Sequence, residues 1–133
     1  TDQPGEPFMK SLLAAVAISA AVLAPAAHAD CSYPQAPSQI PDGNTATLAQ
    51  MLAAQKAVSS YNQEMTAYLS CIQLERDSRV AQAGAQLTKQ QKQELEAIEV
   101  QKHNAAVDQL QSVASQFNAQ VRIFKAKGKK SDD

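Results

Sequence analysis

The sequence has no tryptophan, and only four glycines, two cysteines and two histidines among its 133 residues. Two histidines and two cysteines are too few for an all-protein zinc cluster unless carboxylates contribute. The formal net charge of -1 excludes a polybasic nucleic-acid-binding protein. With 5% aromatic residues and no basic groove, the sequence also predicts no platform for stacking bases. The length suits one small domain at most.

An apolar run long enough for a membrane anchor is also missing. The stretch from Leu12 to Leu23 is shorter than the roughly 20 residues that a membrane-spanning helix needs. It follows Met9-Lys10 and precedes Ala27-His28-Ala29, an order typical of a secretory signal peptide. We predict a cleaved signal at 9–29, with cleavage after Ala29, no stable membrane insertion, and a periplasmic or secreted protein. Residues 1–8 lie upstream of the signal and are left out of the fold.

The two cysteines of an exported chain meet an oxidising compartment, where Cys31 and Cys71 can pair. A segment with several prolines, 30–46, follows Cys31 and is called the proline strip below. We expect it to be extended, with a turn at Pro41-Asp42-Gly43. It can stretch to about 50 Å, while a helix from Thr47 to Cys71 covers about 36 Å. The strip can therefore run back along the helix, and we predict a disulfide that clamps it there.

Two capping boxes mark the expected starts of two helices. In each box a threonine side chain accepts a backbone N–H, and a glutamine three residues later reaches back to the threonine N–H. The first box pairs Thr47 with Gln50, and the second pairs Thr88 with Gln91. The sequence therefore predicts helices that begin directly after Thr47 and Thr88.

The fold class follows from the spacing of glycine and proline. Gly84 is a suitable end for the first helix, and no glycine or proline follows Thr88 until Gly128, which allows a second helix of over thirty residues. We predict an all-α fold in which two long antiparallel helices form a hairpin at 47–126. A disordered, charged tail is expected at 127–133.

The apolar residues of the first helix recur every seven residues, a spacing that suits packing against a second helix. These residues are Met51, Val58, Met65 and Ile72. A flank beside them is expected to form a shallow groove for the prolines and Ile40 of the strip. The flank consists of Ala53, Ala57, Tyr61, Tyr68 and Cys71. The alternative is that the two tyrosines only cover the edge of the core.

The apolar residues of the second helix recur in steps of eleven, which indicates a nearly straight stripe and looser packing than in a regular coiled coil. The three series are Leu95, Ala106 and Phe117; Lys102, Val113 and Phe124; and Leu110 and Val121. Lys102 is then expected to extend its ammonium group outward from the stripe.

A two-helix hairpin leaves one side of its core open, so it needs further stabilisation. The disulfide contributes roughly 4 kcal/mol by the chain-entropy estimate. The other remedy is a partner, either a second copy that completes a four-helix bundle or another envelope protein. The predicted interaction stripe comprises Met51, Val58, Met65, Ile72, Leu110, Phe117 and Phe124.

Groups that could carry chemistry are scarce. After the predicted signal peptide the chain has one histidine, His103, and neither a Gly-rich phosphate loop nor a C-x-x-C pair. Glu99 and His103 have the spacing of a metal pair, with Glu96 nearby, but a solvated helix face explains the same residues. We predict no enzyme, no cofactor and no metal site. The basic residues 122–130 favour weak contact with anionic envelope surfaces, which Asp132 and Asp133 oppose.

Two segments resemble known families. The pattern C-x2-P-x2-P-x2-I-P-D-G from Cys31, with Y-L-x-C ending at Cys71, resembles small exported helical proteins of Gram-negative bacteria. This resemblance implies a disulfide-clamped periplasmic protein, and we expect a structural or protein-interaction module of the cell envelope. The motif L-T-x-x-Q at Leu87 to Gln91 is similar to that of the Spy/CpxP periplasmic chaperones. That family binds unfolded clients on a concave helical cradle, so a chaperone or envelope-stress regulator is the alternative.

Overall fold

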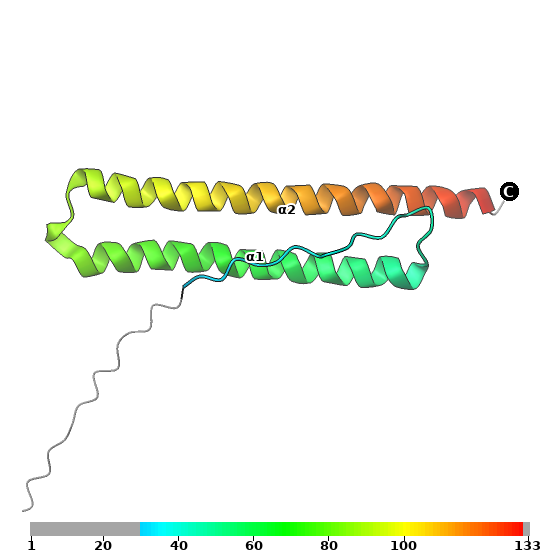
Figure 1. Cartoon of the computed structure of the whole chain (residues 1–133), viewed down its shortest axis with the longest axis horizontal. Coiled ribbons are helices and arrows are strands. Elements are labelled where there is room, and N and C mark those ends of the chain that lie inside the picture. Colours follow the sequence, from blue (N-terminus) through cyan, green and yellow to red (C-terminus); the bar gives the residue numbers. More distant parts are fainter. Residues whose placement is uncertain (1–29, 132–133) are drawn as a thin grey trace, which may run out of the picture.

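The computed structural model describes residues 30–131, which form two long helices with an extended segment along them (Figure 1). Helix α1 spans Leu48–Ala83, the short 3-10 helix η1 spans Gly84–Gln86, and α2 spans Lys89–Ser131. The two helices lie side by side and run antiparallel, which confirms the predicted hairpin. The predicted signal peptide and its cleavage site lie outside the described residues.

Both helices begin at the predicted capping boxes. Thr47 Oγ1 accepts the Gln50 N–H at 3.2 Å, and Gln50 Oε1 accepts the Thr47 N–H at 2.8 Å. The corresponding distances between Thr88 and Gln91 are 3.1 and 2.9 Å. Each box thus provides side-chain acceptors for two backbone N–H groups that would otherwise have no partner at the start of the helix.

Helix α1 ends where the sequence places its glycine. Gly84 has a φ of 52°, in the left-handed region that costs a residue with a Cβ additional energy. Its N–H is donated to the Val80 carbonyl, so the last turn of the helix is closed. This turn reverses the chain and allows α2 to return along α1.

The structure replaces the predicted disordered tail with helix as far as Ser131. Lys127 accounts for part of this difference, because its Nζ donates to the Ala46 carbonyl at 3.1 Å and lies 5.1 Å from the centroid of the Phe124 ring. Basic residues in the last turn also interact favourably with the helix dipole. The hairpin therefore extends beyond residue 126.

The buried seam between the helices follows one heptad pattern in α1. Its buried members are Met51, Ala54, Tyr61, Met65, Tyr68 and Ile72. On α2 the buried residues are Ala106 and Val113, seven positions apart. The same spacing continues to Gln120 and Lys127, which are polar and partly buried. From Ala106 to Lys127 the packing of α2 therefore follows a seven-residue step. The residues of the predicted eleven-residue series are also at least partly buried, except Lys102, which is exposed and lies beside Ile72.

The two polar seam residues contact the turn at the end of the proline strip. The Gly43 N–H is donated to Gln120 Oε1 at 2.8 Å, and Lys127 binds the Ala46 carbonyl. The turn itself is closed by the Thr45 and Ala46 N–H groups, which donate to the Asp42 carbonyl at 3.1 and 2.8 Å. The turn begins at Asp42, within the predicted Pro41-Asp42-Gly43 segment.

No helix within residues 30–131 combines the length and the apolar character that a membrane crossing requires.

Gly43 is the position where the strip approaches α2 most closely, and substitution there should be costly. A Cβ at this position would collide with the Gln120 backbone carbonyl and lie 2.8 Å from the Phe124 backbone nitrogen. We expect Gly43→Ala to lower the free energy of unfolding by about 1–3 kcal/mol, as for other overpacked sites. Chemical denaturation measures the change.

Gly128→Ala is the matched control. Its added Cβ meets nothing within 4 Å, and alanine in a helix is about 0.5–1 kcal/mol more favourable than glycine. Unfolding free energies that move in the same direction for both variants would contradict the close approach of Gly43 to α2.

Candidate functional site

The proline strip covers one flank of the helix seam. It runs from its turn near the C-terminal end of α2 back along the hairpin and reaches the C-terminal half of α1 at Cys71 (Figure 1). Ala36 and Ile40 of the strip pack against the buried cluster, as does Cys31. The strip thus supplies apolar side chains to a core that two helices alone would leave open, and the predicted packing of Ile40 is confirmed.

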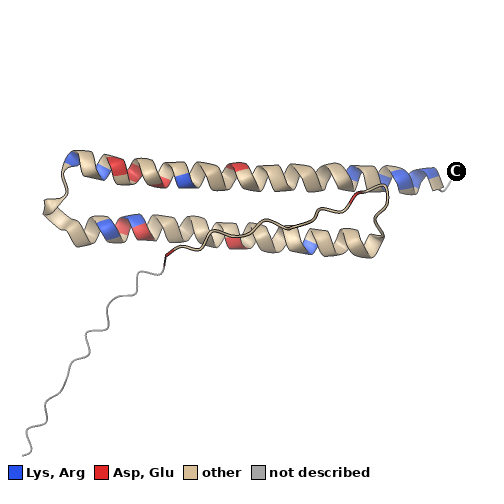
Figure 2. Ribbon diagram, in the orientation of Figure 1, with Lys and Arg blue, Asp and Glu red and all other residues tan. Residues whose placement is uncertain are grey.

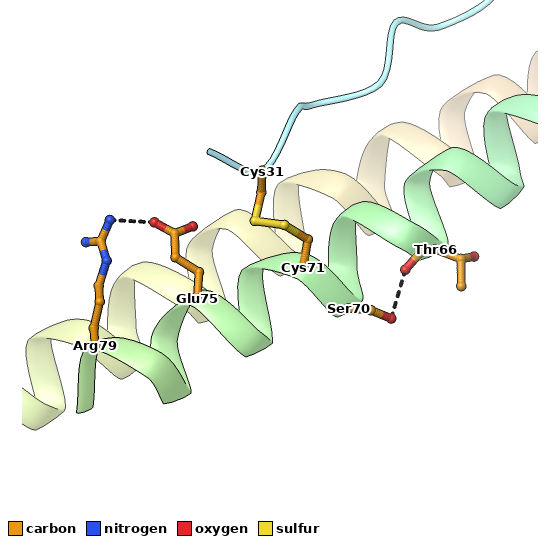
Figure 3. The surroundings of a disulfide bond; sticks show 6 residues. All are labelled: Cys31, Thr66, Ser70, Cys71, Glu75 and Arg79. Carbon is orange, nitrogen blue, oxygen red and sulfur yellow. Dashed lines mark hydrogen bonds and ion pairs between the residues drawn. A yellow bond between two sulfur atoms is a disulfide. The ribbon is translucent and has the colours of Figure 1, made fainter. Parts of the chain in front are cut away.

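The disulfide between Cys31 and Cys71 fixes the beginning of the strip, as predicted. The two Cα atoms are 5.7 Å apart, a usual distance for a disulfide. Figure 3 shows the bond above α1, between the Ser70–Thr66 hydrogen bond and the Glu75–Arg79 ion pair. Because the bond joins residues 40 positions apart, it restricts the unfolded chain as well as the folded strip.

Two buried tyrosines of α1, Tyr61 and Tyr68, lie beneath the strip. The ring of Tyr33, which belongs to the strip, meets the Tyr68 ring edge to face, with the ring centroids 5.0 Å apart. Tyr61 is 2% exposed, and its hydroxyl has no hydrogen-bond partner within the described residues. Burial, followed by the nearby Tyr33 phenol, raises the pKa of Tyr61 and that of Tyr68 above the ordinary 10.0. The neutral phenols are therefore favoured in the folded protein.

The predicted groove for the strip is correct only in part. Tyr61, Tyr68 and Cys71 lie where we expected them, but Ala53 and Ala57 are exposed. The reason is the path of the strip, which leaves α1 to place the backbone of its turn on α2. The sequence predicts a strip that follows α1 alone, whereas in the structure its turn rests on α2.

The opposite flank of the seam carries an apolar groove of about 460 Å³ that no strip residue lines. We call it the open groove. Val58, which lines this groove, lies by helical spacing on the other side of the seam from Cys71. The walls of the open groove come from both helices: Gln55, Val58, Ser59, Tyr61 and Asn62 of α1, and Leu110, Gln111, Val113, Ala114 and Phe117 of α2.

The predicted interaction stripe divides between the core and this groove. Met51, Met65 and Ile72 are buried in the hairpin itself, and Met65 has no exposed surface. Val58, Leu110 and Phe117 line the open groove. Phe124 is partly buried near the turn of the strip. The residues that remain accessible to a partner are therefore those of the open groove.

Most charged residues lie toward the two ends of the hairpin, and its middle carries only a few, such as Glu64 and Asp108 (Figure 2). Near the turn, Arg76 of α1 pairs with Glu99 of α2 at 2.9 Å and with Asp77 at 2.7 Å. Hydrogen bonding to Asp77 raises the pKa of Arg76. Basic residues gather at the far end of α2. The open groove thus lies in a segment where burial against a partner removes few charges from water.

The structure places Glu99 and His103 in separate roles. Glu99 forms an ion pair with Arg76, whereas the side chain of His103 is exposed. Within residues 30–131, no group of three or more His, Cys, Asp or Glu side chains has the arrangement of a metal site.

Comparisons with protein-family models, curated proteins and solved structures found no match for this chain. Within the hairpin, Thr88 and Gln91 of the L-T-x-x-Q motif have a local role, since they cap α2. The functional interpretation therefore depends on the open groove and on the strip that covers the other flank.

Removal of the disulfide should free the strip and weaken the fold. We expect Cys71→Ser to lower the free energy of unfolding by roughly 2–5 kcal/mol. Limited proteolysis should then cut first between Tyr33 and Gly43, where the backbone has lost its packing. Thiol titration of the unfolded, unreduced wild type should find no free thiol. Ser70→Ala, next to Cys71 and exposed, is the control, and equal stability of the two variants would refute the clamp.

The buried phenols predict a loss of stability in alkali. A raised pKa in the folded state means that the stabilisation is complete below pH 10.0 and falls as the pH rises through the raised value. Tyr61→Phe removes a buried hydroxyl that has no hydrogen-bond partner, so the free energy of unfolding at neutral pH should change by less than about 1 kcal/mol. At about pH 10.5 the variant should be the more stable protein in chemical denaturation. A larger alkaline loss in Tyr61→Phe than in the wild type would contradict this account.

Proposed function

We propose that this protein is an exported, periplasmic protein-interaction or structural module of the cell envelope, and that the open groove is its binding surface. One observation carries the proposal: the strip and disulfide cover one flank of the seam, while the other remains an accessible apolar groove. Apolar grooves between helices are typical binding surfaces for a further helix. The proposal assigns a binding role and involves neither a cofactor nor nucleic acid.

The disulfide supports the exported location. Disulfides persist in oxidising compartments, of which the bacterial periplasm is one, and Cys31–Cys71 holds the strip in its place. The signal-like sequence ahead of Asp30 supports the same assignment. Lys129 and Lys130, exposed at the end of α2, favour a weak additional contact with anionic envelope surfaces.

Site-specific photo-cross-linking in cells tests the groove directly. A photoreactive residue at Gln111, in the wall of the groove, should give discrete cross-linked products. The same residue at Ser115, which is exposed on the outer side of α2, should give at most a tenth of that yield, an order-of-magnitude expectation for a site outside the interface. Intact mass of periplasmic material should show a chain that begins at Asp30.

The pattern of products separates the two functional classes. Discrete bands indicate a defined partner, whereas a continuous smear, together with suppression of client aggregation at low stoichiometry, indicates the chaperone alternative. Equal cross-linking from Gln111 and Ser115 would exclude the open groove as the binding surface.

A further inference from the structure

Helix α2 has a second apolar series that the hairpin buries only in part. Its members recur every seven residues along the side of α2 next to the open groove: Val100, Val107, Ala114 and Val121. Val100 remains 47% exposed, and the other three are partly exposed. Leu110 and Phe117, from the wall of the groove, lie beside this series. Such a series is what one helix presents to another in a coiled-coil contact.

Opposite charges stand at the two ends of this series. Glu96 lies one helical turn before Val100, and Lys125 lies one turn after Val121. Both side chains belong to exposed residues, and neither forms an ion pair within residues 30–131. The series is therefore bounded by one exposed anionic and one exposed cationic side chain on the same side of α2, and Glu96 also contributes to the raised pKa of Arg76.

We propose that a second copy of this chain occupies the open groove, with the two α2 helices antiparallel. The register that places Glu96 opposite Lys125 of the partner subunit also places Val100 opposite the partner's Val121. In the same register Val107 lies opposite the partner's Ala114. The three pairs belong to a single register, because the two members of each pair lie at equal distances along the sequence from the same point, between Leu110 and Gln111. The twofold axis at that point repeats every contact, so an ion pair closes each end of the interface.

The distribution of charge favours this orientation over a parallel one. Residues of both signs, Glu96 among them, lie on α2 near the turn, whereas the described residues near its C-terminal end carry basic side chains alone (Figure 2). A parallel pair would place each Lys125 beside its copy and each Glu96 beside its copy, which is unfavourable. The antiparallel pair joins opposite charges, and its apolar middle completes a four-helix bundle.

The inference rests on the proposed function only in using the same groove, and it names a second copy as the occupant. The chain supplies its own complement to the groove in both charge and apolar pattern.

Sedimentation equilibrium of the disulfide-bonded protein and its charge variants tests the register. The wild type should form dimers. Glu96→Lys or Lys125→Glu alone should raise the dimer Kd about tenfold, because two exposed ion pairs become repulsive. The double variant Glu96→Lys/Lys125→Glu should return the Kd to near the wild-type value. In a parallel dimer each of these residues faces its own copy, so a single substitution replaces one pair of like charges by another and would not weaken the dimer in this way.

A second pair of variants tests the apolar contact without disturbing the core. Val100→Lys introduces charge into the interface and should raise the Kd about a hundredfold, since two partly exposed valines lose their burial. Gln101→Lys adds the same charge one residue away, on an exposed position, and should leave the Kd unchanged. Circular dichroism should show equal helix content for both variants.

A wild type that stays monomeric at all concentrations would overturn the proposal, as would a dimer that is indifferent to Val100→Lys or to the charge swap. These outcomes are separate from the proposed function. A monomer that still forms Gln111 cross-links to another protein would leave the groove as a binding surface and remove only the second copy.

Discussion

The bond between Cys31 and Cys71 determines which side of this helix pair is covered. It holds the start of the proline strip on the flank of α1 that carries Tyr68, and the strip then fills that flank with Ala36 and Ile40. Two helices of such length have few apolar residues with which to bury one another, so a third segment completes the core. Because the strip is a single chain, it can complete only one flank. The open groove on the other flank is a consequence of that limit.

Local signals in the sequence predicted much of this fold because they depend on near neighbours. The capping boxes at Thr47 and Thr88 and the glycine at Gly84 act within one turn of a helix. The seam of α2 could not be predicted in the same way. Gln120 and Lys127 occupy seam positions because their partners are backbone groups of the strip, 77 and 81 residues away. A search among the apolar residues of α2 alone therefore misses these two seam positions.

The candidate site shows the same division between what sequence can and cannot specify. Val58, Leu110 and Phe117 were predicted as interaction residues and line the open groove, but Met65 from the same stripe is completely buried. Periodicity identifies the apolar side of a helix, and it does not say which part of that side the protein covers itself. The position of Cys71 held the missing information, because the flank that carries the disulfide is the flank that the strip covers.

The place of the disulfide on α1 also decides how the hairpin would respond to mechanical force. A pull applied to the N-terminal end of the described chain, at Asp30, passes through the covalent bond to Cys71, in the C-terminal half of α1. The proline strip and its turn lie outside that load path, in a slack loop. Tension would therefore act on the packed centre of the helix pair, while Gly43 and its hydrogen bond to Gln120 carried none of it.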